Sequence, residues 1–371
     1  MNKSIHIIAF DIPFPANYGG VIDVFYRIKA LHELGVSIKL HCFSYGNRQE
    51  ALALEKYCDQ VFYYPRKKFS FDILKPYIVS TRSSELLLEN LLKDEDPILF
   101  EAIHSCYYLN HPKLSGRFKM VRMHNIEHDY YELLARSEPK FLQRTYYEIE
   151  SILLRRYESI LNHADVILTI SHKDKNCLQT RFGNRVKLLP AFHGNTSVNS
   201  KLGRGDYCFY HGKLSVAENN LAAIFLVKEV FSLIKVPFII AGDGISSDLR
   251  KAIMPYDHIK LIEGIGPEEI NDLIQNAHIN VLPTFQPTGI KLKLVNVLFQ
   301  GRFMLANTHM VNATGLEDAC IIEDNPIKMS ELIVELMKRD FKEDDLSQRR
   351  MVLGSQFNVL ENAKMLIELL P

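Results

Sequence analysis

Short apolar runs and amphipathic stretches alternate along the chain. Ile5–Phe10 is an apolar run of strand length, and Ser37–Phe43 is a second expected strand. Between them Val21–Leu34 repeats apolar residues at helical spacing until Gly35 closes the helix. This order predicts a parallel sheet. Further strands are expected at Gln60–Tyr64, Pro97–Phe100, Phe118–Met123, Ala164–Ser171, Val186–Leu189, Tyr207–Tyr210, Pro237–Ala241, Ile259–Ile262, Ile279–Leu282 and Arg302–Ala306. Further helices are expected at Ser83–Leu92, Tyr130–Arg136, Phe141–His163, Ala217–Leu233, Pro267–Asn276, Pro326–Arg339 and Asp345–Leu370.

The strand-and-helix alternation is interrupted once. Residues 190–205 have no periodicity and are rich in Asn, Ser and Gly, which is typical of a hinge between domains. A chain of 371 residues is long enough for two domains with full cores. We therefore expect an α/β protein of two Rossmann-like domains, residues 1–195 and 205–371, whose parallel sheets face each other across a cleft.

Charge and composition narrow the class of protein. Lys plus Arg equals Asp plus Glu at 44 each, which argues against nucleic acid as the main partner. The six cysteines are scattered, without a C-x-x-C pair, and read as buried apolar residues of a reducing compartment. The sequence contains no run of 18 or more apolar residues, so no membrane span is predicted and a cytoplasmic protein is expected.

One basic segment carries an aromatic residue. Arg66, Lys67 and Lys68 are followed by Phe69, a mixture that suits peripheral contact with the inner membrane face or a lipid-linked acceptor. The simpler alternative is a solvated loop beside a short packed helix.

A second candidate site follows the strand at Ile279–Leu282. Proline and glycine residues interrupt that strand, apolar residues recur at helical spacing from Ile290, and Gly301 ends the helix. A helix N-terminus after a glycine-containing loop binds anions, and Lys291 and Lys293 add positive charge there. Near the first strand, Gly19 and Gly20 open a helix without the G-x-G-x-x-G fingerprint, and could equally be a loop that needs positive φ.

His124 and His128 allow two interpretations. Together with Glu127 they match H-x-x-E-H, a zinc-hydrolase pattern in which both histidines share one helix face. However, a strand precedes His124 and Asn125 is a plausible helix N-cap, which would place His124 at a strand end facing the interdomain crevice. A merely packed or capping histidine is a third possibility.

Three of these motifs resemble those of GT-B glycosyltransferases, in particular the large retaining family of sucrose synthases and bacterial mannosyltransferases. The Pro15-to-Gly20 loop resembles the family's Pro-x-x-x-Gly-Gly loop, and Gly212-Lys213 resembles its Gly-Arg-Leu motif. Aligned on Gly301, the family's two motif glutamates fall on Thr288 and Asn296, so both carboxylates are absent. The second lysine that usually follows Gly-Arg-Leu is also absent.

The resemblance implies an enzyme that moves a sugar from a nucleotide-diphosphate sugar to an acceptor hydroxyl, retaining and metal-independent, in surface polysaccharide or glycolipid synthesis. The donor would bind the second domain and a glycan or lipid-linked acceptor the first, onto which the last helix would pack back. Lys213 and Lys291 would neutralise the leaving diphosphate and His124 would contact the sugar or acceptor, with no metal and no cofactor. The donor-binding residues would be Gly19, Gly20, Gly212, Glu263, Gly264, Thr288, Gly289, Ile290 and Asn296, where Asn296 would replace a carboxylate on the ribose.

Three other classes remain open at this point. The fold also serves sugar-nucleotide epimerases and could serve a binding protein that has lost catalysis with its two carboxylates. The zinc hydrolase built on His124 and His128 is the third.

Overall fold

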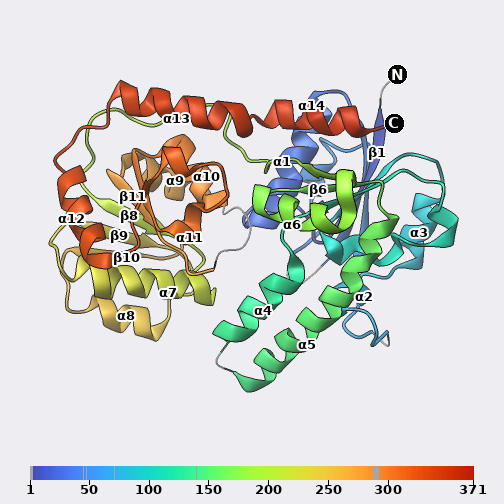
Figure 1. Cartoon of the computed structure of the whole chain (residues 1–371), viewed down its shortest axis with the longest axis horizontal. Coiled ribbons are helices and arrows are strands. Elements are labelled where there is room, and N and C mark those ends of the chain that lie inside the picture. Colours follow the sequence, from blue (N-terminus) through green and yellow to red (C-terminus); the bar gives the residue numbers. More distant parts are fainter. Residues whose placement is uncertain (1–2, 45, 47, 71, 139, 287–291) are drawn as a thin grey trace. The chain divides into compact units, whose positions relative to one another are not determined.

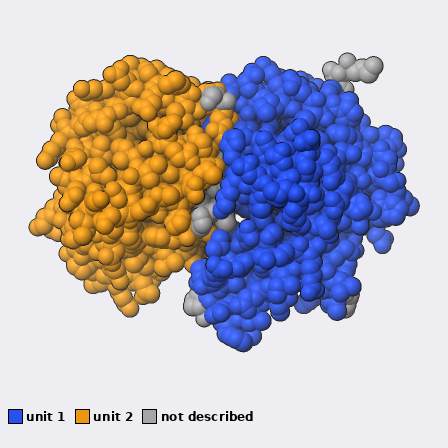
Figure 2. All heavy atoms as spheres, viewed as in Figure 1, with its two compact units in different colours: residues 1–194, 288–290, 357–371 blue, residues 195–287, 291–356 orange. Residues whose placement is uncertain are grey.

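The protein forms two compact units. A computed structural model describes residues 3–44, 46, 48–70, 72–138, 140–286 and 292–371. Of these, residues 3–194 and 357–371 belong to the first unit, and residues 195–286 and 292–356 to the second (Figure 2). Each unit consists of one parallel sheet with helices packed on it (Figure 1).

The first sheet has seven parallel strands in the order β3-β2-β1-β4-β5-β6-β7. The strands are β1 (Ser4–Ala9), β2 (Ser37–Ser44), β3 (Gln60–Pro65), β4 (Ile98–Glu101), β5 (Lys119–Met123), β6 (Val166–Thr169) and β7 (Val186–Leu188). The α-helices are α1 (Gly19–Glu33), α2 (Tyr77–Ser80), α3 (Glu85–Leu91), α4 (Glu127–Ser137), α5 (Phe141–Tyr157), α6 (His172–Phe182) and α14 (Val359–Leu369). The 3-10 helices are η1 (Leu52–Leu54), η2 (Ile103–Tyr108), η3 (Pro112–Leu114), η4 (Glu158–His163) and η5 (Gly183–Arg185).

Both faces of this sheet are buried, as expected for parallel strands covered by helices. Alternate residues of each strand enter two separate apolar clusters: Ile8 and Phe100 lie in one, and Ile7 and Leu99 in the other. The second cluster includes residues of α1 and α14, so the C-terminal helix packs on the α1 side of the first sheet.

The second sheet has six parallel strands in the order β10-β9-β8-β11-β12-β13. The strands are β8 (Cys208–His211), β9 (Phe238–Ala241), β10 (Ile259–Ile262), β11 (Ile279–Leu282), β12 (Phe303–Ala306) and β13 (Ile321–Ile322). The helices are α7 (Ala217–Phe225), η6 (Leu226–Phe231), α8 (Ser247–Ile253), α9 (Pro267–Asn276), α10 (Leu292–Gln300), α11 (Thr308–Val311), η7 (Glu317–Ala319), α12 (Pro326–Leu336) and α13 (Glu343–Gln356).

The two sheets share one topology. In each, strand order reverses between the unit's first and fourth strands, which are β1 and β4 in one unit and β8 and β11 in the other. Ligands of doubly wound sheets bind beyond the carboxyl ends of strands at this switch point. The topology therefore selects one edge of each sheet for the search that follows.

The predicted strands and most predicted helices are confirmed, whereas α8, α11 and β13 were not predicted. Other predicted helices differ in where they end or in their type. The helix expected over Phe141–His163 ends at Tyr157 and continues as the 3-10 helix η4, and the one expected over Ala217–Leu233 turns into the π-helix η6 after Phe225. The stretch Asp345–Leu370 is two helices, because the Asn358 side chain accepts hydrogen bonds from the N–H groups of Leu360 and Glu361 and caps α14.

Two helix N-termini can be compared with the capping residues that precede them. The predicted Asn125 cap is wrong: the residue before α4 is Ile126, and no side chain caps this helix. Ser171 caps α6, since its hydroxyl accepts from the N–H of Asp174 at 3.0 Å. Over the described part of the chain, no helix is long and apolar enough to cross a membrane.

Candidate active site

In the second unit, the loops that follow β8 and β9 lie in close contact. A Cβ atom on Gly242 would lie 1.9 Å from the carbonyl oxygen of Gly212, and one on Gly244 would lie 2.5 Å from the Cβ of Ser215. Gly242 has φ of 156° and Gly244 of 76°, which are conformations that favour glycine. These glycines let two strand-end loops approach at the carboxyl edge of the sheet. Gly212 thus belongs to a tightly built loop.

Asn219 links this loop to α10. Its side-chain N–H₂ donates to the carbonyl oxygen of Lys213 at 3.1 Å, and its oxygen accepts from Nζ of Lys293 at 3.0 Å. The Lys293 ammonium also lies 5.2 Å from the ring centroid of Tyr210, and Lys213 is exposed. Lys293, which comes from another element, thus lies beside the loop that carries Lys213.

Neighbouring groups show the effect of that charge. His211 is buried at the end of β8, and burial together with Lys293 lowers its pKa to about 3. On β11's side of the switch point, the Thr284 hydroxyl donates to Glu218, and the Thr284 N–H donates to the side chain of Asn307 at 3.0 Å. A cation and a neutral imidazole therefore lie where β8 ends, next to a carboxylate that is hydrogen-bonded from β11.

Two predicted donor-binding positions have defined partners. The Asn296 amide donates to Asn271 at 2.9 Å and accepts from Asn195 at 3.1 Å, which forms a chain of amides rather than an isolated group. Glu263, at the end of β10, pairs with Arg250 at 2.6 Å, and this hydrogen bond lowers its pKa. Gly264 follows with φ of 74°.

Four predicted positions, Thr288, Gly289, Ile290 and Lys291, lie outside the described residues. The predicted convergence of Lys213 with Lys291 stays a prediction for that reason. The helix after them, α10, ends at Gln300 as expected, and a Cβ on Gly301 would lie 2.4 Å from Nδ2 of Asn280.

In the first unit, His124 lies directly after β5, beside the ends of β1 and β4. The ring of Phe10, the residue after β1, meets His124 edge-on at 5.5 Å between centroids and His104 at 5.6 Å. The same ring covers Gly20, whose Cβ would lie 2.7 Å from Cζ of Phe10, whereas nothing lies within 4 Å of a Cβ on Gly19. Gly19 and Gly20 are the first two residues of α1 and not a separate loop.

Beneath His124 lies a buried cluster of four charged side chains. Asp23 accepts from Nη1 of Arg27 at 2.7 Å and from Nε and Nη2 of Arg122 at 2.7 and 2.8 Å. Glu101 accepts from Arg27 on one oxygen and lies 3.1 Å from Nε2 of His124 on the other. Burial alone would raise the pKa of Asp23, but Arg122 and Arg27 outweigh it, and the pKa lies well below its ordinary value. Two cations and two anions thus compensate each other under the ring.

A second histidine–carboxylate pair stands next to the first. Nε2 of His104 lies 3.4 Å from Oε2 of Glu127, the first residue of α4. Burial lowers the pKa of His104, with Glu127 acting in the opposite direction. Sequence patterns singled out only His124 of this group; Phe10, His104 and the four charged residues were missed.

Comparisons with known proteins give a family match for one stretch of the chain and a fold for the whole of it. Residues 205–339 match the family model described as Glycosyl transferases group 1. This stretch of the chain is therefore similar to a group 1 glycosyltransferase domain. The prediction of a glycosyltransferase, and hence of an enzyme, is confirmed by this match. A Klebsiella pneumoniae protein, named as an uncharacterized 44.6 kDa protein in cps region, is 26% identical over 354 residues, 90% of this chain and 91% of that protein.

Solved structures confirm the GT-B fold of the whole chain. A mutant of S. aureus TarM, in complex with Fondaparinux, alpha-GlcNAc-glycerol and UDP, matches with a TM-score of 0.69 at 11% identity, over 98% of this chain and 99% of that chain. An alpha,alpha-trehalose-phosphate synthase (UDP-forming) from Burkholderia xenovorans, in complex with glucose-6-phosphate, matches with a TM-score of 0.65 at 11% identity, over 99% of each chain.

The zinc interpretation of this glycosyltransferase fails on geometry. His128 lies on α4 and its ring nitrogens lie 3.3 Å from Asp129 and 3.3 Å from Glu158, while His124 precedes the helix and contacts Glu101. Among the described residues, His128 is in no group of three possible metal ligands. The H-x-x-E-H match is therefore a coincidence of spacing.

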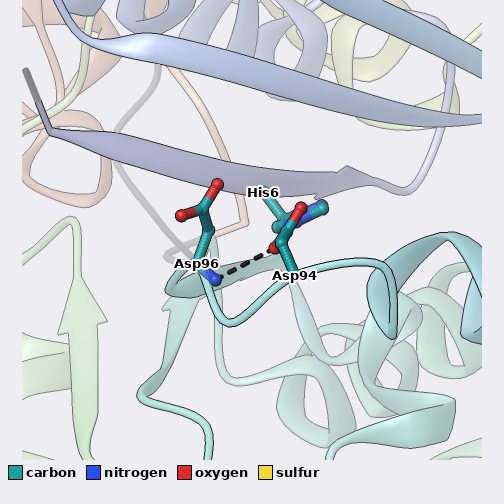
Figure 3. Close-up of side chains that lie close together, drawn as sticks. All are labelled: His6, Asp94 and Asp96. Carbon is teal, nitrogen blue, oxygen red and sulfur yellow. Dashed lines mark hydrogen bonds and ion pairs between the residues drawn. The ribbon is translucent and has the colours of Figure 1, made fainter.

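Two other groups bring three possible metal ligands within 4.8 Å, and both are already neutralised. In the first, the carboxylates of Asp23 and Glu101 receive the guanidinium hydrogens described above. In the second, His6, Asp94 and Asp96 converge from β1 and the loop before β4 (Figure 3). Nζ of Lys39 donates to both of these aspartates, at 2.7 Å to Asp96. In each group, an ammonium or guanidinium already donates hydrogen bonds to the carboxylates.

Proposed function

We propose that the protein transfers a sugar from a nucleotide-diphosphate sugar to an acceptor hydroxyl, in the synthesis of a polysaccharide or glycolipid. The observation that carries the proposal is the group 1 glycosyltransferase match of residues 205–339, whose strand-end loop at Gly212 and Lys213 is joined by Lys293. The cps region in the name of the Klebsiella relative supports a polysaccharide product. UDP in the TarM complex and the UDP-forming synthase support a nucleoside diphosphate as leaving group.

Metal-independent transfer is part of this proposal. A leaving diphosphate needs positive charge, which Lys213 and Lys293 supply near the end of β8, and to which Lys291 would add. Retention of the anomeric configuration is also proposed; the resemblance to the retaining family supports it. The ¹H NMR coupling constant of the anomeric proton in the glycoside product, compared with that in the donor, measures it directly.

The decisive experiment measures nucleoside diphosphate binding by calorimetry with EDTA present. Losing one charge-assisted contact costs about 1.5–3 kcal/mol, so Lys213→Ala and Lys291→Ala should each weaken binding about tenfold to a hundredfold. Lys235→Ala is the matched control, because Lys235 is exposed and precedes β9 at the opposite edge of the sheet. Binding that requires a divalent ion, or that both variants leave unchanged, would overturn the phosphate site. Release of free nucleoside diphosphate in the presence of donor and acceptor tests transfer itself.

Peripheral contact with an anionic membrane is a further part of the proposal. The side chains of Phe69, Ile73 and Leu74 are 82%, 81% and 84% exposed, directly after the basic run Arg66–Lys68. Phe141 and Leu142 of α5 are 77% and 84% exposed. Arg66 and Lys67 also bond Thr81 and Ser83, at 2.8 Å each, so part of the basic run is structural.

Vesicle sedimentation tests this contact. The double variant Phe69→Ser, Leu74→Ser should lose most of its binding to phosphatidylglycerol vesicles, because each exposed side chain contributes apolar area that inserts into the interface. Leu233→Ser is the control, since Leu233 is 56% exposed in the second unit. Equal sedimentation of wild type and double variant would remove the membrane from the proposal without affecting transfer.

A further inference from the structure

The two ring nitrogens of His124 have different surroundings. Nε2 lies 3.1 Å from Oε2 of Glu101, whereas Nδ1 has no hydrogen-bond partner in the described part of the chain. The His124 side chain is 10% exposed and that of Glu101 is fully buried. Only one edge of the imidazole is therefore left to meet a ligand.

Glu101 is held so that it can act only as an acceptor. Its other oxygen accepts from Arg27, and Arg27 is fixed from its far side by Asp23 at 2.7 Å. An ionised carboxylate offers lone pairs and no hydrogen. The hydrogen between Glu101 and a neutral His124 must then be on Nε2, and Nδ1 keeps its lone pair.

We infer that Glu101 is a positioning residue, which fixes the Nε2–H tautomer of His124 so that Nδ1 accepts a hydrogen bond from a sugar or acceptor hydroxyl. This inference rests on the proposed function, which supplies a ligand rich in hydroxyl groups. The edge of the Phe10 ring, 5.5 Å from His124 between centroids, restricts the imidazole from a second direction. With the tautomer fixed, Nδ1 of His124 accepts a hydrogen bond, so a ligand group that donates a hydrogen is favoured beside it over a group that can only accept.

The backbone after Glu101 supports a specialised role for this strand end. Ala102 has φ of 54° and ψ of 167°, a conformation that residues with a side chain rarely adopt. Its N–H donates to the carbonyl oxygen of Arg122 at 2.8 Å, so the strained residue is tied to the strand that leads into His124. Such strain persists where surrounding structure over-determines it, and it gathers at functional sites. Here it lies one residue from Glu101 and two from His104.

The tautomer can be read in the wild-type protein without any variant. Selective ¹⁵N-histidine labelling and long-range ¹H–¹⁵N correlation spectra, recorded at about pH 8 where ordinary histidines are neutral, distinguish Nε2–H from Nδ1–H. The His124→Gln spectrum assigns the signal. The expected result is an Nε2–H tautomer for His124. An Nδ1–H tautomer overturns the inference, and this outcome does not depend on whether any donor is turned over.

Variants then test whether the tautomer matters. Glu101→Gln replaces the acceptor with an amide that can also donate, so His124 should populate both tautomers and kcat/KM should fall about tenfold to a hundredfold. Glu101→Asp keeps the charge beside Arg27 and withdraws the carboxylate by one methylene; it should give a smaller loss and serves if the amide variant does not fold. His172→Gln, at an exposed position of α6, should change neither quantity. A folded Glu101→Gln protein with unchanged tautomer and unchanged kcat/KM would contradict the assignment.

Discussion

The two ends of the first sheet each carry a buried histidine paired with a carboxylate. At the carboxyl end His124 lies 3.1 Å from Glu101, and at the amino end Nε2 of His6 lies 2.8 Å from Asp94 (Figure 3). In each pair the carboxylate also accepts a hydrogen bond from a cation. Arg27 donates to Glu101, and Lys39 donates to Asp94. By residue type alone, the two clusters look equivalent.

They differ in what the ring can still bind. Nδ1 of His6 is 2.8 Å from Nε2 of His41, whose own Nδ1 is 2.8 Å from the Tyr64 hydroxyl, to which Asn90 donates. Both ring nitrogens of His6 and both of His41 are therefore hydrogen-bonded within the protein. His124 keeps Nδ1 without such a partner among the described residues. A histidine–carboxylate pair indicates a ligand site when one ring edge is left over, and a structural network when none is.

The largest contrast is expected in stability. Asp23→Asn should cost about 3–5 kcal/mol of unfolding free energy, because Arg27 and Arg122 would be left as buried charges without their shared carboxylate. Asp94→Asn should cost less, about 1–3 kcal/mol, since Asp94 and Lys39 are 26% and 21% exposed. Urea denaturation followed by fluorescence measures both. Equal losses of unfolding free energy would mean that an unpaired charge costs no more in the cluster under His124 than in the one at the amino end.

The amino-end chain should make stability depend on pH. Burial lowers the pKa of His41 and of His6, and nearby cations (Lys39 at both, Lys93 at His41, Arg117 at His6) lower it further. Asp94 acts in the opposite direction and does not reverse the shift. A lowered pKa means that the unfolded chain binds more protons below about pH 6.5, so stability is full above that pH and falls as pH drops. Each histidine should contribute a slope of up to about 1.4 kcal/mol per pH unit.

Denaturation at pH 5.5 to 7.5 checks this slope against the His41→Gln variant. The histidines outside the hydrogen-bonded pair His6–His41 are present in both proteins, so the difference in slope comes from this pair. The variant should show a shallower dependence of unfolding free energy on pH. If the two slopes agree, His41 is not held neutral by its surroundings.

The sequence predicted the fold because its signals are local. Strand and helix periods depend on residues a few positions apart, and so do the helix ends at Gly35 and Gly301. The Asn125 cap failed for the same reason: a capping residue type was present one position too early, and α4 began after Ile126. Asn358 is also a capping residue type, but it lies inside a long helical pattern, and the helix start that it marks was not predicted.

The charged cluster under His124 could not be assembled from the sequence, because its members come from α1, β4 and β5. One signal was available. Asp23 and Arg27 stand next to Val24 and Ile28 on the buried side of a helix, and Arg122 interrupts a buried strand. Charged residues at core positions are rarely buried unless paired. That rule could have predicted partners for them, although not their identity or their place below His124.

The smallest effect is expected at the start of α1, where two adjacent glycines provide a matched pair. Gly20→Ala should destabilise the protein by about 1 kcal/mol, the low end for overpacking, because the new Cβ would lie 2.7 Å from Cζ of Phe10 and the ring edge can tilt away. Gly19→Ala meets nothing within 4 Å and should be neutral or gain up to about 1 kcal/mol through a less flexible unfolded chain. Since the Phe10 ring lies against His104 and His124, Gly20→Ala should also shift the ring signals of both histidines in the labelled spectra, whereas Gly19→Ala should not. If both variants change the unfolding free energy in the same direction and the histidine signals do not move, then the Phe10 ring does not transmit a change at α1 to His104 and His124.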